Sequence, residues 1–121
     1  MPNSVLMVDD SYSMRQLVAF TVKNGGYDVE TAGSANEAVE KLTAGKFDMV
    51  ITDLNMPGID GIELIRTLRA LPDYKFVPII MLTTESQEAK KQEGRAAGAS
   101  GWIVKPFSPD RLLAVVERFM K

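Results

Sequence analysis

Short apolar runs alternate along the chain with longer stretches in which apolar residues recur every three or four positions. A continuous apolar run of this length is typical of a strand that is buried on both faces, and four of the five runs have this form. The second run, YDVET, alternates apolar and polar residues instead, which favours a place at the edge of a sheet. We therefore predict five strands, at residues 5–8, 27–31, 49–52, 77–82 and 102–104.

The longer stretches carry the apolar spacing of amphipathic helices and begin or end at capping residues. Ser34 with Glu37 and Ser108 with Pro109 are typical of helix starts, and the stretch NGG at 24–26 and Gly45 are typical of helix ends. A fourth helix is expected over about residues 86–97. The buried faces are predicted to hold Met14, Leu17, Val18, Thr21 and Val22 in the first helix, Ala38, Val39 and Leu42 in the second, and Ile62, Leu64, Ile65, Leu68 and Leu71 in the third.

Five repeats of strand and helix predict an α/β fold with a doubly wound, five-stranded parallel sheet flanked by five helices. The 121 residues contain no linker, repeat or low-complexity segment, so we expect a single domain over 1–121. In such sheets, ligands bind beyond the carboxyl ends of the strands, where the strand order reverses.

Composition excludes several kinds of chemistry and of partner. Cysteine and histidine are absent, which excludes disulfides, a thiol nucleophile, a Ser/His/Asp relay and an imidazole site for zinc. The net charge is −2 and the charges are interspersed, so no basic stripe suits nucleic acid. Every apolar run is far shorter than the roughly 18 residues of a membrane span. We expect a cytoplasmic protein with no nucleic-acid or membrane partner.

Polar residues stand where four of the predicted strands end. Asp9 and Asp10 follow the first strand, Asp53 the third, Thr83 the fourth and Lys105 the fifth. Because parallel strands end at one edge of the sheet, we expect these side chains to meet. Three carboxylates and one lysine leave an excess of negative charge that a hard cation such as Mg²⁺ would relieve.

Each of these residues has an ordinary structural explanation when it is considered alone. Adjacent aspartates commonly form turns or helix caps, and Asp53 precedes a turn-forming PG pair. Thr83 would by default cap a helix, and Lys105 would be a solvated loop charge. Four separate strand ends that supply complementary groups to one place favour a functional site over these explanations.

The segments VDDS, ITDLNMPGIDG, MLTTES and VKPF occur in this order across the chain and resemble the receiver domain of two-component response regulators. Among receivers, the length of the chain and the stretches DDSYSMRQ and TTESQEAKKQ are most similar to CheY-like chemotaxis regulators. This resemblance implies the flavodoxin-like receiver fold. It also implies a protein that catalyses only its own phosphorylation and dephosphorylation, without turnover of a substrate.

The resemblance assigns a role to each strand-end residue. It implies that Asp53 becomes the 4-aspartylphosphate, that Lys105 neutralises phosphoryl oxygens, and that the Thr83 hydroxyl turns toward the phosphoryl group. Receivers more often have tyrosine or phenylalanine where this chain has Trp102, as an aromatic residue that moves inward with the threonine. Trp102 is therefore expected to be part of the switch, and a static, half-buried packing residue is the alternative.

The resemblance also implies the ligands of a Mg²⁺ ion, with Mn²⁺ as an alternative ion. Asp10, Asp53 and the backbone carbonyl of Asn55 would bind the ion directly, and Asp9 would act mainly through water. The Asn55 side chain and Glu85 occupy positions through which the family tunes the lifetime of the phosphoryl group.

Three partners follow from these implied roles. The chain has no histidine, so a histidine that donates the phosphoryl group must belong to a partner. The resemblance implies that this partner is a histidine kinase, CheA-like, with small acyl phosphates as alternative donors. The expected target is the flagellar motor switch or another protein that docks on the fourth helix, fifth strand and fifth helix, and a phosphatase is a further partner. The charges expected on that surface are Glu88, Lys90, Lys91, Arg95, Arg111 and Arg118.

A second docking surface, for the kinase, is predicted on the first helix. Tyr12, Gln16 and Phe20 fall opposite the predicted buried face, together with Ala19 and Lys23. Exposed aromatic residues favour an interface, and the alternative is that Phe20 packs against the neighbouring helix. Pro106 is expected to extend this surface.

We also predict a cis peptide bond before Pro106. A sharp turn is needed to direct Lys105 back over the strand ends, because Ser108 begins a helix only two residues after the proline. The cis form of an X-Pro bond costs only about 0.5–1 kcal/mol.

Other functions stay open at this point. A receiver outside chemotaxis would serve as a phosphorelay intermediate or phosphate sink. A metal-dependent phosphohydrolase with an aspartate nucleophile would have a second carboxylate two residues after Asp53, where this chain has Asn55. A P-loop ATPase would need a GxxxxGK[ST] loop, which is absent, and Asp9 and Asp10 would repel the phosphate of a bound FMN.

Overall fold

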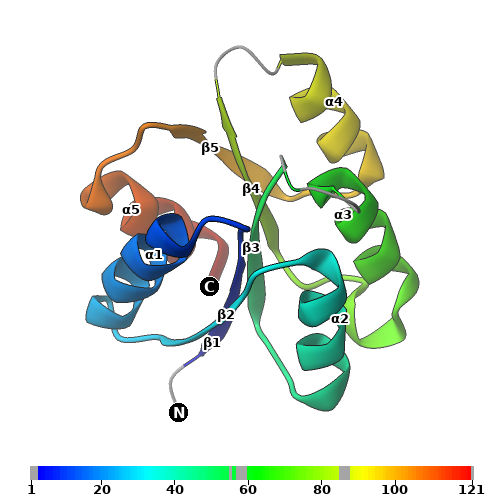
Figure 1. Cartoon of the computed structure of the whole chain (residues 1–121), viewed down its shortest axis with the longest axis horizontal. Coiled ribbons are helices and arrows are strands. Elements are labelled where there is room, and N and C mark those ends of the chain that lie inside the picture. Colours follow the sequence, from blue (N-terminus) through cyan, green and yellow to red (C-terminus); the bar gives the residue numbers. More distant parts are fainter. Residues whose placement is uncertain (1–2, 55, 57–59, 85–87, 121) are drawn as a thin grey trace.

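In the computed structural model, which describes residues 3–54, 56, 60–84 and 88–120, five parallel strands form one sheet (Figure 1). The strands are β1 (Ser4–Val8), β2 (Asp28–Ala32), β3 (Met49–Asp53), β4 (Ile79–Thr84) and β5 (Gly101–Lys105). Their order across the sheet is β2-β1-β3-β4-β5, so the order reverses between β1 and β3. The predicted doubly wound architecture is confirmed.

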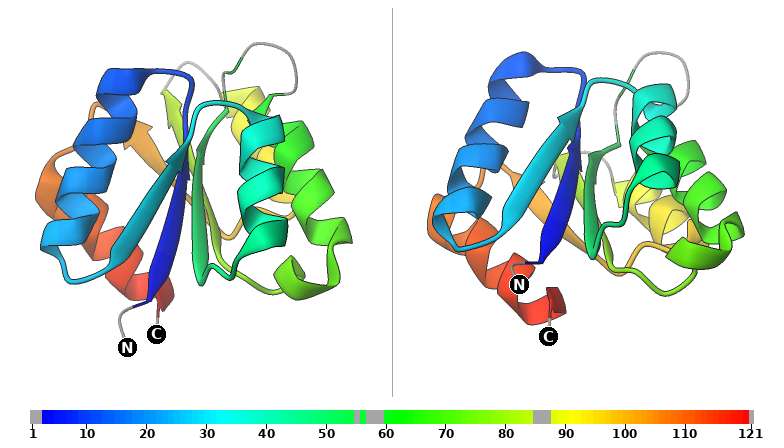
Figure 2. Two further views of the ribbon diagram at one scale, coloured as in Figure 1. Left: turned by 60° about the horizontal axis from the view of Figure 1, so that its bottom comes forward. Right: turned by 90° about the horizontal axis from the view of Figure 1, so that it is seen from below.

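Helices cover both faces of the sheet, as the two views of Figure 2 show. One face carries α1 (Tyr12–Asn24) and α5 (Pro109–Met120), and the other carries α2 (Ala35–Ala44), α3 (Gly61–Ala70) and α4 (Glu88–Ala97). A short 3-10 helix, η1 (Pro72–Tyr74), follows α3 and was not predicted. Within the described segments, no helix has both the length and the apolar character that a membrane span requires.

Two apolar layers form the core, one on each side of the sheet. Val5 and Met7 of β1 pack in the layer beneath α1 and α5, whereas Leu6 and Val8 pack in the layer beneath α2 and α3. All four side chains are fully buried. Burying a side chain of this size stabilises a fold by about 1.5–3 kcal/mol, so β1 is held firmly between the layers and its carboxyl end is fixed in place.

The edge strands differ from each other in how well the sequence predicts them. β2 alternates between exposed and half-buried residues, as predicted for an edge. β5 was predicted to be buried on both faces, which is wrong, because Trp102 and Val104 are only half-buried. The reason is that β5 forms the other edge of the sheet.

The strand β4 begins at Ile79 and not at residue 77 as predicted, because the preceding Pro78 has no N–H for the hydrogen bonds of a strand ladder.

The helix α1 is rotated about its axis relative to the prediction, so its buried face differs in part from the predicted one. Leu17 was predicted to be buried but is 46% exposed, and Ala19 was predicted to be exposed but is buried. The buried arc consists of Val18, Ala19, Thr21 and Val22. Apolar residues lie on both sides of this arc, so the spacing alone could not fix the rotation of the helix against β2 and α5. Leu71 was predicted to lie on the buried face of the third helix, which is wrong, because it follows the end of α3.

Candidate functional site

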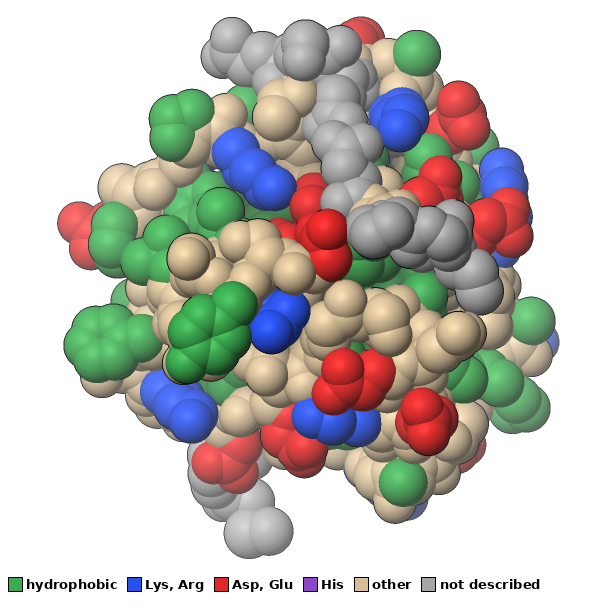
Figure 3. Space-filling view, viewed as in Figure 1, with side chains coloured by type: hydrophobic (Ala, Val, Ile, Leu, Met, Phe, Trp, Pro, Cys, Tyr) green, Lys and Arg blue, Asp and Glu red, His purple; other side chains and the backbone are tan. Residues whose placement is uncertain are grey.

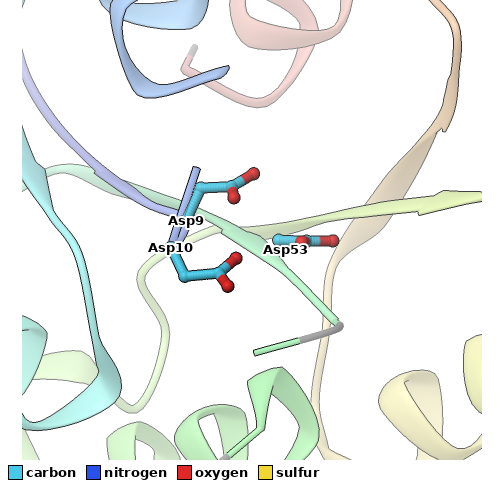
Figure 4. Close-up of side chains that lie close together, drawn as sticks. All are labelled: Asp9, Asp10 and Asp53. Atoms are coloured by element: carbon cyan, nitrogen blue, oxygen red, sulfur yellow. The ribbon is translucent and has the colours of Figure 1, made fainter. Parts of the chain in front are cut away.

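The strand ends bring the predicted site residues together at one edge of the sheet, where Figure 3 shows acidic side chains near the middle of the surface. Asp9, Asp10 and Asp53 each place a carboxylate oxygen within 4.8 Å of the others (Figure 4). Asp9 and Asp53 are buried, and Asp10 is exposed. The three carboxylates therefore form one acidic cluster that opens to solvent on the side of Asp10.

Asp9 lies deepest in this cluster and is only 1% exposed. Its Oδ1 accepts a hydrogen bond of 2.9 Å from the Ser11 amide, but its Oδ2 is buried and has no hydrogen-bond partner among the described residues. Burial raises the pKa of the Asp9 carboxyl; the hydrogen bond from Ser11 opposes this effect, and the negative charge of Asp53 adds to it. A buried carboxylate oxygen without a partner is costly, so a cation in the cluster would supply what the chain itself does not.

Asp53 is paired with the lysine of β5. The Nζ atom of Lys105 lies 3.1 Å from Oδ1 of Asp53, and the side chains are 23% and 7% exposed. The sheet register places Asp53 beside Leu82 of β4 and Lys105 beside Thr84. The carboxylate of Asp53 thus lies between the carboxylates of Asp9 and Asp10 and the ammonium group of Lys105.

Thr83 lies on the strand between Asp53 and Lys105 and is 1% exposed. Its hydroxyl is 3.3 Å from the carbonyl oxygen of Thr84, to which it donates a hydrogen bond. The predicted gathering of strand-end residues is thereby confirmed as geometry for Asp9, Asp10, Asp53 and Lys105, with Thr83 on the strand between the last two. Asn55 and Glu85, the remaining predicted residues, lie outside the described residues.

The donor set of the acidic cluster fits a hard divalent cation. Asp9, Asp10 and Asp53 supply only carboxylate oxygens, which Mg²⁺ and Mn²⁺ prefer. Within the described part of the chain, Oδ2 of Asp9 meets no hydrogen-bond donor. Among the described residues, these three form a group that could hold such an ion.

A comparison with known families agrees with this geometry. The sequence model of one protein family, the response regulator receiver domain, matches residues 5–117 of this chain. The chain belongs to the response regulator receiver family. Receivers are signalling proteins that interact with histidine kinases and with downstream targets, and they bind Mg²⁺ through acidic residues.

Two chemotaxis proteins of Vibrio cholerae and one transcriptional regulator illustrate the similarity of this receiver to others. The chain is 35% identical to chemotaxis protein CheY-3 over 97% of its own length and 91% of that protein. A solved structure of V. cholerae CheY4 superposes with a TM-score of 0.94 at 49% identity, covering 98% of this chain and 99% of the other. ResD of Bacillus subtilis, a transcriptional regulatory protein, is 37% identical over 97% of this chain, which spans only 48% of ResD.

The predicted docking residues of the receiver all lie on its surface. Tyr12 and Phe20 are each 68% exposed, and Gln16 and Pro106 are exposed as well. The alternative that Phe20 packs against the neighbouring helix is therefore wrong. Leu17 joins the two aromatic residues as a third exposed apolar side chain of α1, which the predicted orientation of this helix had hidden.

Trp102 is half-buried on β5 and is covered by two cations of α4. The Nζ atom of Lys91 lies 4.9 Å from the centre of a Trp102 ring, and Cζ of Arg95 lies 5.1 Å from it. Cations at these distances over an aromatic face are attracted to it. The tryptophan therefore contacts the helix that follows Thr83 in the chain, and its part in the switch stays a prediction.

The Lys105–Pro106 peptide bond is cis, as predicted.

Sequence reasoning gave no role to two residues that shape the receiver site. Gly61 begins α3 so close to the end of β3 that a Cβ atom there would overlap the carbonyl oxygen of Asp53. The signal was present, because a glycine directly after the N-cap residue Asp60 is an unusual choice in a helix. Arg15, which reaches the β1–α1 connection from α1, had no recognisable signal at all.

Replacing Asp9 by asparagine should stabilise the ion-free receiver. Asn can still accept the Ser11 hydrogen bond through its oxygen, while the buried negative charge beside Asp53 is removed. Because folding raises the pKa of Asp9, the folded state binds more protons than the unfolded state, and stability is lost as pH rises from the ordinary aspartate range through the raised pKa. At neutral pH we expect Asp9→Asn to raise the free energy of unfolding by about 1–2 kcal/mol in urea titrations with chelator present.

The same experiment has an internal control at acidic pH. Below the ordinary pKa of aspartate the wild-type carboxyl is neutral in both states, so the gain from Asp9→Asn should vanish there. A variant that is less stable than the parent at neutral pH would show that Asp9 is stabilised as an anion by the chain.

Proposed function

We propose that this receiver is a response regulator of a two-component phosphorelay, that it accepts a phosphoryl group on Asp53 from a histidine kinase, and that it signals in chemotaxis. The observation that carries the proposal is the placement of the Asp53 carboxylate between the Lys105 ammonium, 3.1 Å away, and two further carboxylates at one sheet edge. The similarity to CheY-3 and CheY4 over nearly the whole length of both proteins supports chemotaxis. The similarity to ResD, a transcriptional regulatory protein, supports a second candidate, a receiver outside chemotaxis, for which we propose the role of a phosphorelay intermediate or phosphate sink.

The transfer step needs a nucleophile and neutralisation of charge more than it needs bond-making groups. A carboxylate oxygen of Asp53 forms a bond to phosphorus while the bond from phosphorus to an imidazole nitrogen of the kinase breaks. The electron pair of that bond stays on the imidazole, which takes a proton from water. Lys105 lies where its positive charge offsets the negative charge of the phosphoryl oxygens.

A divalent ion would complete this neutralisation. Mg²⁺, or Mn²⁺, supplies positive charge to the phosphoryl oxygens when it is bound by Asp10, Asp53 and the Asn55 carbonyl, with Asp9 acting through water. The chain's own contribution is to hold the carboxylate oxygens of Asp9, Asp10 and Asp53 close together in spite of their mutual repulsion. Autodephosphorylation then sets the lifetime of the signal, for which Asn55 and Glu85 are the proposed tuning residues.

Docking surfaces for both partners are proposed from exposure and charge. A CheA-like kinase would contact Tyr12, Gln16, Phe20 and Pro106, which all lie on the surface. The flagellar motor switch, or another target, would dock on α4, β5 and α5, and a phosphatase would act on the phosphorylated form. Such a relay operates in the cytoplasm, where we place the protein.

Phosphate stoichiometry tests the proposal against the enzymatic alternative. The full chain is incubated with Mg²⁺ and either a small acyl phosphate or a phosphorylated histidine kinase, and bound phosphate is measured with and without acid treatment. The receiver function predicts one acid-labile phosphate per chain. Sustained hydrolysis of a small phosphoester, without a bound phosphate, would instead show a phosphohydrolase.

Trp102 offers a direct readout of the proposed switch. We expect Mg²⁺ with beryllium fluoride, a mimic of the phosphoryl group, to change the emission of this single tryptophan, because phosphorylation would shift an existing equilibrium of Thr83 and Trp102. Thr83→Ala should bind the mimic and yet lose most of the emission change. An equal response in Thr83→Ala, or none in the parent, would mean that Trp102 does not report the switch.

A further inference from the structure

The side chain of Arg15 reaches back from the first turns of α1 to the backbone of the acidic cluster. Its Nη1 atom donates a hydrogen bond of 2.8 Å to the carbonyl oxygen of Asp9. This carbonyl belongs to the peptide unit that joins Asp9 to Asp10. The Asp10 side chain accepts no hydrogen bond from any other described residue, so the backbone before it, which sets the position of its Cβ atom, is the part of Asp10 that the chain holds in place.

Three hydrogen bonds hold Asp9 in place, and Arg15 supplies the one that faces Asp10. The Asp9 amide donates to the carbonyl of Ala32 over 3.1 Å, and its Oδ1 accepts from the amide of Ser11 over 2.9 Å. These two bonds fix the end of β1 and the Asp9 carboxylate. The bond from Arg15 is the one that holds the carbonyl of the following peptide, and it thereby opposes a rotation that would move the two like charges apart.

The residues around Arg15 leave room for its guanidinium group to reach Asp9. A Cβ atom added to Gly33, in the connection between β2 and α2, would lie 3.1 Å from Nη1 and 3.6 Å from Cζ of Arg15. The Gly33 amide is itself held by Oε1 of Glu37 over 2.8 Å. The Arg15 Cζ atom also lies 5.7 Å from the centre of the Tyr12 ring. The guanidinium group therefore passes beside Tyr12 of its own helix and close to Gly33 on its way to Asp9, and the missing Cβ atom of Gly33 leaves room for it.

We propose that Arg15 is a positioning residue for the divalent cation of this receiver. By holding the Asp9 carbonyl, it keeps the Asp10 carboxylate directed toward Asp9 and Asp53 in the absence of the ion, so that the site does not have to be assembled when the ion arrives. A hydrogen bond from a charged donor is strong enough for this task, and residues that orient metal ligands commonly change metal affinity about 10- to 100-fold. The inference rests on the proposed function, because it takes the acidic cluster to be the cation site.

Calorimetric titration of the full chain with MgCl₂ tests this role. We expect Arg15→Met to raise the dissociation constant for Mg²⁺ about tenfold, because the Asp9–Asp10 peptide loses its restraint. Arg15→Lys retains a donor that can reach a carbonyl and should stay within about threefold of the parent. Arg66→Met, which removes an exposed arginine of α3, is the matched control and should bind as the parent does.

A second readout separates positioning from a purely structural role. If Arg15 only positions the cation ligands, saturating Mg²⁺ should restore the rate at which Arg15→Met takes phosphate from a small acyl phosphate. Gly33→Ala keeps every charge and crowds the guanidinium by a few tenths of an ångström, so it should weaken Mg²⁺ binding about two- to threefold even if Arg15→Met does not fold.

The outcomes distinguish failure of this inference from failure of the proposed function. Asp10→Asn is titrated in parallel and should bind Mg²⁺ much more weakly than the parent. If Asp10→Asn loses affinity while Arg15→Met and Gly33→Ala bind normally, Arg15 has no positioning role and the cation site stands. If Asp10→Asn also binds normally, the acidic cluster is not the cation site and both proposals fall.

Discussion

An Asp53→Asn variant of this receiver should incorporate no phosphate from a phosphorylated histidine kinase or from a small acyl phosphate, whereas the parent should take up one phosphate per chain. The amide has nearly the shape of the carboxylate but lacks the anionic oxygen that attacks phosphorus. Asp53 is the carboxylate of the cluster that lies next to Lys105, so no other described carboxylate is placed to receive the group in the same way. Bound phosphate, measured by intact mass or by radiolabel, gives the result.

The control for this variant is Asp73→Asn, which replaces an exposed aspartate of η1 outside the acidic cluster. It should be labelled as the parent is. Full labelling of Asp53→Asn on another residue would transfer the acceptor role away from Asp53, and partial labelling would point to Asp9 or Asp10 as a second acceptor within the cluster.

The fold was predictable because its rules are local in the sequence. Continuous apolar runs gave the strands, capping residues such as Ser34 gave the helix starts, and the end of each strand gave the position of its polar residue. The convergence of Asp9, Asp53 and Lys105 then followed from the topology alone, because parallel strands end at the same edge. Residues more than 40 positions apart could thus be placed together without any knowledge of side-chain contacts.

The details that failed depend on contacts between elements. The rotation of α1 was wrong at Leu17 and Ala19 because apolar residues flank the buried arc on both sides, and packing against β2 and α5 decides which of them is covered. Gly61 could have been noticed as a glycine in a helix, but the reason for it is its closeness to the Asp53 carbonyl at the end of β3. The Arg15 bond to Asp9 spans six residues and follows no motif, so only the structure reveals it.

The charge of Lys105 should affect phosphate transfer and cation binding in opposite directions. Lys105 Nζ is 3.1 Å from Asp53 Oδ1 and belongs to a partly buried pair, where charges interact more strongly than in water. We expect Lys105→Met to slow phosphorylation of Asp53 about 10²-fold, because the phosphoryl oxygens lose one neutralising group. The same variant should bind Mg²⁺ about two- to threefold more tightly, because a positive charge next to the acidic cluster has been removed.

This opposite response separates Lys105 from the residues that hold the cation, for which transfer and Mg²⁺ affinity should fall together. Lys105→Arg keeps the positive charge and should recover most of the transfer rate, whereas Lys46→Met, an exposed lysine in the connection that precedes β3, should change neither quantity. Transfer rates from a small acyl phosphate and calorimetric Mg²⁺ titrations give both measurements on the same samples. Parent-like transfer in Lys105→Met would mean that Lys105 only balances the charge of Asp53 in the resting receiver, and that the phosphoryl oxygens are neutralised by the cation without it.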